Sequence, residues 1–186
     1  MSLREKVRVS LDEFHALTDR PENADHRLEL IDGEIVEKSM PKPMHGLVFH
    51  LIYILLHTFL AKNPIGQIFA EVQFEVPGED YAPIPDIAFV SDTQPKFDLY
   101  KNIPFMPALA IEIQSPSQSD LEMVEKAHYY LKHGGQMVWL VYADRQLIEV
   151  LTRTERKLLT RDQTIDGGAV LPGFQAAVAD MFPQIP

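Results

Sequence analysis

Residues 109–117 read LAIEIQSPS, a short apolar run that carries a carboxylate and an amide two positions apart. Its β-branched residues are typical of a buried strand, and Ser-Pro-Ser ends that strand before a helical pattern begins at Asp120. Side chains two apart on a strand point to one face of a sheet, so Glu112 and Gln114 are expected on the same side. Because burying an unpaired carboxylate is costly, Glu112 requires a cationic partner, a proton or a metal ion.

A second carboxylate stands at the mouth of another apolar run. Residues 85–90 read PDIAFV and place Asp86 directly before the strand-forming residues. Polar groups at strand ends beside a crossover helix lie where α/β sheets usually carry a site. The question that the sequence poses is whether Asp86 and Glu112 meet. They are candidates for metal ligands, for the acid and base of a hydrolase, or for a structural polar pair.

The overall composition narrows the class of protein. A chain of 186 residues predicts one domain over 1–186, since a domain of this length buries roughly 70% of the surface its unfolded chain exposes. The absence of cysteine argues against a disulfide scaffold and thiolate chemistry, and it is compatible with the cytoplasm.

Charge and hydropathy bear on possible partners. The first ten residues lack the apolar core of a signal peptide, and the longest apolar stretch, residues 47–60, is too short to span a bilayer. We therefore expect a cytoplasmic protein without a membrane partner. The net charge of −10 opposes non-specific attraction to nucleic acid.

Hydrophobic patterning predicts an α/β or α+β domain, a mixed sheet flanked by helices with β-hairpins. The strand at 109, the following helix and the strand at 137 form a β-α-β unit with parallel strands, and the runs at 67 and 85 pair antiparallel. The expected helices cover 10–18, 45–61 and 120–133, the expected hairpin covers 28–31 and 34–37, and further strands cover 67–76, 85–90, 109–114, 137–142, 147–151 and 157–160.

The helix at 45–61 contains both apolar and histidine side chains. Three- and four-residue steps predict its buried face as Leu47, Leu51, Ile54, Leu55 and Phe59. Its histidines are five and seven residues apart, which does not match the i, i+4 pair by which a helix holds zinc. His45 lies in the first turn, where a side chain can point into a cleft, so it is a candidate site residue.

Several segments, in one order, resemble a known family. They are LELIDGEIVE at 28–37, PKPMHG at 41–46, PDIAFVS at 85–91, AIEIQSPS at 110–117, EK at 125–126, MVWLVYAD at 137–144 and LPGF at 171–174. This set resembles the Uma family of predicted bacterial endonucleases, formerly a domain of unknown function, within the restriction-endonuclease-like PD-(D/E)xK superfamily. The likeness extends from about Glu13 to Phe182 and implies a restriction-endonuclease-like fold.

The resemblance implies a metal-dependent endonuclease that hydrolyses DNA phosphodiester bonds. Such chemistry needs a hard cation, Mg²⁺ or Mn²⁺, which prefers oxygen ligands. Asp86 and Glu112 would supply two carboxylates, and the backbone carbonyl of Ile113 would be a natural third ligand. Restriction-like nucleases cut two strands most simply as two-fold dimers, so a homodimer is expected.

The chain departs from the full motif at one position, where Gln114 replaces a lysine. A glutamine can hold water but brings no positive charge, and by resemblance Lys126 on the following helix could supply it. Alternation in residues 28–30 predicts that Glu29 faces solvent, whereas its match to a family position makes it a candidate ligand or supporting residue. The alternative function, favoured by Gln114 and the acidic charge, is a catalytically weakened relative that binds nucleic acid or protein.

Overall fold

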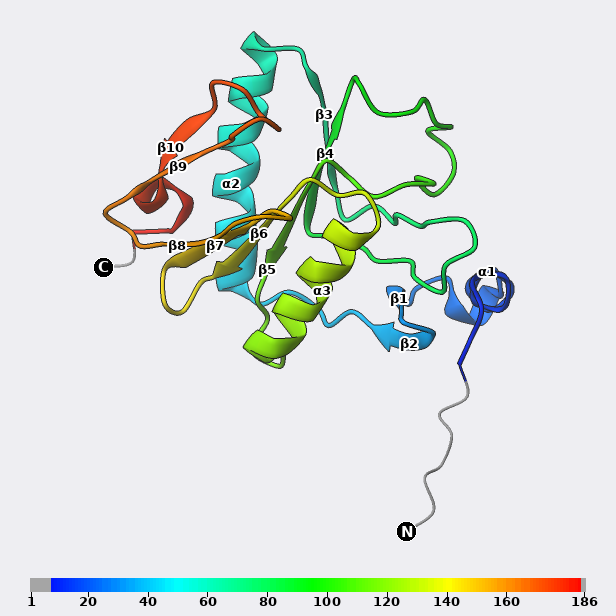
Figure 1. Ribbon diagram of the computed structural model, residues 1–186. Helices are drawn as coiled ribbons and strands as arrows, with labels where there is room; N and C mark the ends of the chain where they lie inside the picture. The colour runs from blue at the N-terminus through cyan, green and yellow to red at the C-terminus, as the bar shows by residue number, and fades with distance from the viewer. Residues whose placement is uncertain (1–7, 185–186) are drawn as a thin grey trace.

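The structure, a computed structural model, describes residues 8–184. Its centre is a six-stranded mixed sheet in the order β3-β4-β5-β6-β7-β8, in which β5 and β6 are parallel and the other neighbours are antiparallel (Figure 1). The predicted mixed sheet flanked by helices is therefore confirmed. The strands are β3 (Gly66–Ala70), β4 (Ile87–Ser91), β5 (Leu109–Ile113), β6 (Met137–Tyr142), β7 (Leu147–Leu151) and β8 (Arg156–Leu159).

Smaller elements lie around this sheet. The predicted hairpin is present as β1 (Leu28–Ile31) and β2 (Glu34–Glu37), joined by Asp32 and Gly33 with positive φ angles of 49° and 76°. Helix α1 (Leu11–Thr18) begins with a capping box formed by Ser10 and Glu13 and contacts β1. The remaining elements are η1 (Pro21–Asn23), β9 (Thr164–Asp166), β10 (Gln175–Ala177) and η2 (Val178–Met181).

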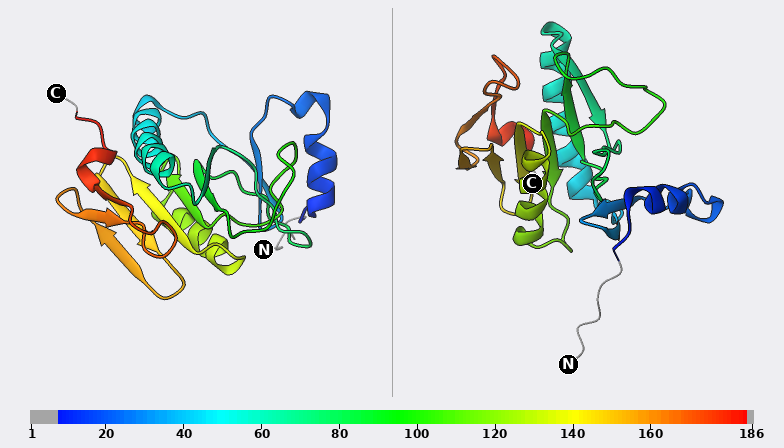
Figure 2. Two further views of the ribbon diagram at one scale, coloured as in Figure 1. Left: turned by 90° about the horizontal axis from the view of Figure 1, so that it is seen from above. Right: turned by 45° about the vertical axis from the view of Figure 1, so that its right-hand side comes forward.

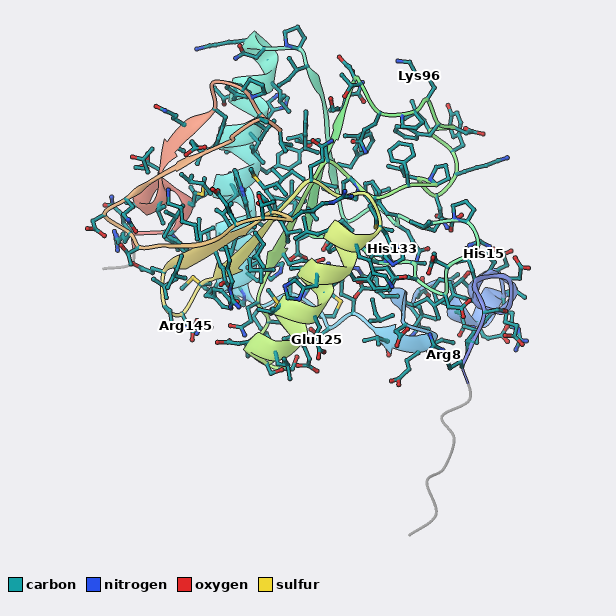
Figure 3. All side chains as sticks on the ribbon, viewed as in Figure 1. Arg8, His15, Lys96, Glu125, His133 and Arg145 are labelled. Atoms are coloured by element: carbon teal, nitrogen blue, oxygen red, sulfur yellow. The ribbon has the colours of Figure 1, made fainter. Side chains whose placement is uncertain are left out.

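Two helices cover opposite faces of the sheet (Figure 2). Alternate residues of β4 and β5 face α2 (Pro43–Lys62) on one side, and the others face α3 (Asp120–Lys132) on the other. On the α3 side Ala88 and Ala110 are small, which lets the helix approach the strands. Side chains fill both layers (Figure 3), and Glu112 belongs to the α3 side.

The face that α2 buries differs from the predicted one. The buried residues are His45, Val48, Ile52, Leu56 and Leu60, whereas the side chains of Leu47 and Ile54 are 49% and 46% exposed. No residue from 43 to 61 is charged, so periodicity had no polar side from which to locate the buried stripe. Within the 20 residues of α2, an 18-residue stretch has a mean hydropathy of 1.6, so by length and composition alone this helix is long enough and apolar enough to cross a membrane.

Two further expectations are corrected by the structure. The strand predicted at 67–76 ends at Ala70, because Glu71 adopts a φ angle of 55° that interrupts the extended chain. In α3 the spacing of apolar residues predicts an inner side of Leu121, Val124, Ala127, His128 and Leu131, but Leu121 is 66% exposed. The residues that α3 buries are Met123, Lys126, Ala127, Tyr130 and Leu131.

Candidate active site

The pairing of β4 with β5 determines where the two carboxylates lie. Ile87 is the partner of Ile111, so the residue before Ile87 lies opposite the residue after Ile111. Asp86 and Glu112 are therefore neighbours across the two strands, with their side chains on one face. Asp86 is 1% exposed and Glu112 is 3% exposed. The strand pattern thus places two buried carboxylates at one point of the sheet.

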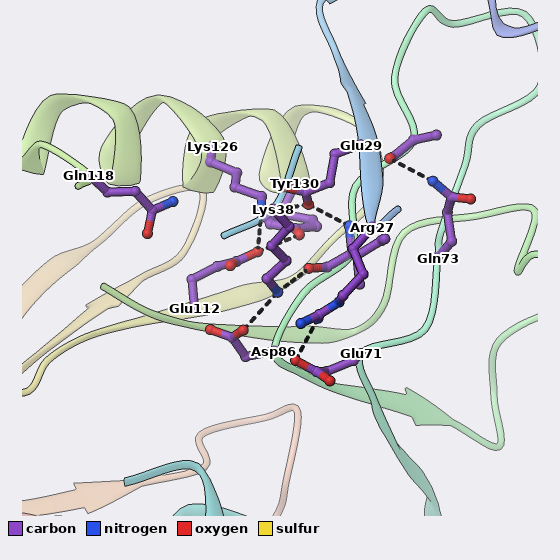
Figure 4. A network of polar contacts seen from close by, with 12 residues as sticks. Arg27, Glu29, Lys38, Glu71, Gln73, Asp86, Glu112, Gln118, Lys126 and Tyr130 are labelled. Atoms are coloured by element: carbon purple, nitrogen blue, oxygen red, sulfur yellow. Dashed lines mark hydrogen bonds and ion pairs between the residues drawn. The ribbon is translucent and has the colours of Figure 1, made fainter. Parts of the chain in front are cut away.

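Asp86 is held as an anion by three donors. Lys38 Nζ lies 2.7 Å from Oδ1 (Figure 4), and the Ile113 N–H donates to Oδ2 over 2.7 Å. His45 Nε2 lies 3.2 Å from Oδ2. Burial alone would raise the pKa of Asp86, but the hydrogen bond from His45 and the Lys38 charge outweigh it and hold this pKa well below its usual range.

Glu112 is bound by two residues of α3. The Tyr130 hydroxyl donates to Glu112 Oε1 over 2.6 Å, and Lys126 Nζ lies 2.9 Å from the same oxygen. Tyr130 and Lys126 are four residues apart and so point to one side of the helix. Burial raises the pKa of Glu112, and the nearby Asp86 and Glu29 carboxylates add to that rise, while Lys126 opposes it. This carboxylate is therefore the more readily protonated of the pair.

Lys126 joins the sheet to the N-terminal hairpin. Its ammonium lies 2.8 Å from Glu29 Oε1, which also accepts the Ile84 N–H over 2.6 Å. Burial alone would lower the pKa of Lys126, but the charges of Glu112 and Glu29 outweigh it and raise this pKa. Lys126 therefore stays charged while buried between two carboxylates.

The expectation that Glu29 faces solvent is wrong, because Glu29 is 5% exposed. Its neighbour Leu30 packs on the opposite side of the hairpin, in a cluster with Phe14 and Ala82. Both sides of β1 are therefore covered, and Glu29 turns inward because Lys126 offsets the cost of burying its charge. The alternation of residues 28–30 correctly separated Glu29 from Leu30 but could not show that both sides were covered.

A cavity of about 230 Å³ opens beside the carboxylates. Two cationic side chains, Arg27 and Lys38, form part of its wall, and Arg27 also pairs with Glu71 over 2.5 Å. Lys126 lies behind the carboxylates and is not among the residues of the wall. Carboxylates outnumber these cations in the wall, and the other lining residues include Glu29, Glu37, Glu71, Asp86, Glu112, Glu122, His45, Ile113, Ser115, Ser117 and Gln118.

Gln114 does not share this cavity. It follows the end of β5, and its amide nitrogen donates to the Gln118 carbonyl over 3.0 Å and to Asp120 over 2.9 Å. Arg145 donates to its amide oxygen over 3.2 Å and also binds Asp120. The structure thus brings Glu29, His45, Asp86, Glu112, Ile113 and Lys126 together and places Gln114 in a separate polar group.

Two residues of the site were not anticipated from the sequence. Tyr130 could have been found, because it lies four residues after the candidate Lys126 and so shares its side of the helix. Lys38 follows β2 in a segment without periodicity, and it reaches Asp86 across 48 positions of sequence. No local pattern indicates such a contact.

The donor set of the site suits a hard cation. Two adjacent carboxylates and the neighbouring Ile113 carbonyl are oxygen donors, the type that Mg²⁺ and Mn²⁺ prefer. Within residues 8–184, no group of three or more His, Asp or Glu side chains is arranged to hold a metal ion. A divalent cation would therefore be held here by a small number of protein ligands, and water and substrate phosphate would complete its coordination, which is the usual way in which proteins bind Mg²⁺.

A family model named Uma2 and described as "Putative restriction endonuclease" matches residues 11–179. The chain is also similar to a crystal structure from Anabaena variabilis ATCC 29413, described as "a putative nuclease belonging to DUF820", with a TM-score of 0.79. The two are 24% identical over 94% of this chain and 97% of that chain, a level at which the likeness shows the fold. Among curated proteins, none matches this sequence.

Proposed function

Because the chain belongs to the Uma2 family, we propose that it is a metal-dependent endonuclease that hydrolyses DNA phosphodiester bonds. The observation that supports this proposal most directly is the placement of Asp86 opposite Glu112 beside a cavity with cationic side chains in its wall. We further propose that the whole chain acts as one restriction-endonuclease-like domain.

Asp86, Glu112 and the Ile113 carbonyl would hold Mg²⁺ or Mn²⁺, which would polarise the phosphoryl oxygen and activate a water molecule. The residues around them keep these ligands in position. His45 and the Ile113 N–H bind one oxygen of Asp86, and Tyr130 and Lys126 bind one oxygen of Glu112. These contacts leave Oε2 of Glu112 unused, whereas the second oxygen of Asp86, Oδ1, accepts a hydrogen bond from Lys38.

Lys126 would compensate in part for the lysine that the motif lacks at Gln114. Its ammonium lies 2.9 Å from Glu112 and places a positive charge beside the proposed ligands. Glu29 would hold that ammonium in place through its 2.8 Å contact. In this role Lys126 positions Glu112 and offsets its charge from behind the cavity wall.

Two copies of the chain would cut two strands as a two-fold homodimer. We propose that they meet on the exposed face of α2, where Leu47 and Ile54 lie, because no residue from 43 to 61 is charged. Each copy carries a net charge of −10, and contact through an uncharged face avoids bringing like charges together. This use of α2 agrees with a soluble cytoplasmic protein, in which the other face of the helix packs on the sheet.

Calorimetry with Mn²⁺ followed by plasmid nicking tests the proposal. The wild type should bind Mn²⁺ and nick the plasmid only with the metal present, and Asp86→Asn and Glu112→Gln should lose both properties. Glu125→Gln is the matched control, because Glu125 is exposed on α3 next to Lys126. Metal binding without nicking would favour the alternative of a nucleic-acid or protein-binding module, and absence of metal binding would refute the nuclease.

A further inference from the structure

Lys38 is a cation at this site for which the motif gives no role. Its ammonium donates to Asp86 Oδ1 and to the Ile84 carbonyl, each over 2.7 Å. Toward the described residues it thus uses two of its three N–H donors, and its side chain is 14% exposed. The third donor remains for an acceptor in the cavity, whose wall Lys38 helps to form.

Lys38 and Lys126 differ in what they can reach. Lys126 is bound by Glu29 and Glu112 and lies behind the cavity wall. Lys38 projects from the segment between β2 and α2, where its own N–H is fixed to the Arg27 carbonyl over 2.7 Å. A lysine side chain has a flexible four-carbon stem, so the ammonium can move while the backbone stays in place. Lys38 is therefore the lysine of this pair that can contact a molecule in the cavity.

Lys38 also competes with any metal ion that uses Asp86. An ammonium and a divalent cation both require the negative charge of this carboxylate, and they repel each other at contact distances. Lys38 also shares the wall of the cavity with Glu112, so its charge acts on that carboxylate as well. Both proposed ligands thus lie under the influence of the same ammonium group.

We propose that Lys38 is a built-in cation that neutralises Asp86 until a divalent ion binds that carboxylate, and then turns its ammonium to the substrate phosphate. This inference rests on the proposed nuclease function and deepens it, because it assigns the phosphate contact to Lys38. It also explains how the site dispenses with a lysine at position 114. A purely structural Lys38 would stabilise Asp86 but would not oppose metal binding.

The test compares Mn²⁺ affinity with nicking activity in Lys38→Gln. This change removes the charge and keeps an N–H donor for the Ile84 carbonyl. We expect Mn²⁺ to bind about tenfold more tightly, since an opposing charge has left, and nicking at saturating Mn²⁺ to fall by about tenfold or more. Lys38→Arg should restore most of the activity with wild-type metal affinity. Lys42→Gln is the control, because Lys42 is exposed four residues along the same segment.

The combination of tighter Mn²⁺ binding and weaker nicking in Lys38→Gln distinguishes this role from a purely structural one. Unchanged or weaker Mn²⁺ binding by Lys38→Gln, with normal binding by the wild type, overturns the inference and leaves the proposed function intact. Tighter binding with undiminished nicking overturns the phosphate contact. Absence of Mn²⁺ binding in both proteins overturns the inference together with the proposed function. If Lys38→Gln does not fold, Lys38→Met is measured in its place, with the same outcomes.

Discussion

Replacement of Lys126 by methionine should destabilise the protein in a way that depends on pH. The ammonium of Lys126 lies 2.8 Å from Glu29 and 2.9 Å from Glu112, and both carboxylates are almost fully buried. Methionine has a similar helix propensity and a similar length, so the change removes mainly the charge. Two buried carboxylates then lose their shared cation, and breaking one buried ion pair typically costs about 3–5 kcal/mol.

The pH dependence follows from the carboxylates that remain. Without Lys126, the pKa of Glu112 in the folded protein rises further above its ordinary value of 4.5. A carboxyl with a raised folded-state pKa favours the fold below its unfolded pKa, and this contribution is lost as pH rises through the folded value. Each unit of difference is worth about 1.4 kcal/mol. The free energy of unfolding of Lys126→Met should therefore approach that of the wild type near pH 4 and fall behind it toward pH 7.

Urea unfolding at a fixed protein concentration measures this effect through Trp139, which is the single tryptophan and is fully buried. Lys132→Met serves as the control, because Lys132 is exposed on the same helix. The double variant Lys126→Met/Glu112→Gln should recover part of the lost stability. A loss under about 1 kcal/mol at pH 7, or a loss that is equal at pH 4.5 and pH 7.5, would refute the reasoning.

Three shorter predictions concern other parts of the molecule. The depressed pKa of Asp86 contributes stability that is present above its ordinary value of 3.8 and is lost as pH falls. The difference in free energy of unfolding between wild type and Asp86→Asn, measured in urea, should therefore shrink from pH 6 to pH 3, and a constant difference would contradict this. Gln114→Lys should increase neither Mn²⁺ affinity nor nicking, because the new ammonium would lie beside Asp120; a tenfold gain would show that this position reaches the cavity. Ile54→Lys should lower the sedimentation coefficient toward that of a monomer. Leu158→Lys, at an exposed apolar control position on β8, should leave the sedimentation coefficient unchanged, and the reverse result would place the interface away from α2.

The central strands were predictable because their signals are local. The apolar runs at 109–113 and 137–142 lie on either side of a helical pattern, which predicts parallel neighbours, and the structure confirms this pairing. The positions of Asp86 and Glu112 followed from where charged residues interrupt such runs. The same kind of signal predicted the hairpin at Asp32 and Gly33, because only a few residue pairs suit its backbone angles.

The features that sequence reasoning missed are set by tertiary packing. Helix α2 lacks charged residues from 43 to 61, so its buried face depends on the sheet that it meets rather than on its own periodicity. Glu29 is buried because Lys126 reaches it from 97 positions away in the sequence. Lys38 meets Asp86 in the same way, through the path of a segment without regular structure. A sequence indicates that a buried charge needs a partner, but it does not identify a partner so distant.

The charges at the site also bear on how an acidic protein could approach a polyanion. The buried group contains the carboxylates of Glu29, Asp86 and Glu112, opposed by the ammonium groups of Lys38 and Lys126, and His45 contacts Asp86. The charges of this buried group nearly cancel, so one divalent cation would turn the group from negative to positive, although Glu37, Glu71 and Glu122 add negative charge to the cavity wall and the chain as a whole is at −10. Attraction of phosphate would then be confined to the cavity and to the metal-bound protein. The acidic composition therefore opposes non-specific association with DNA without opposing catalysis at this site.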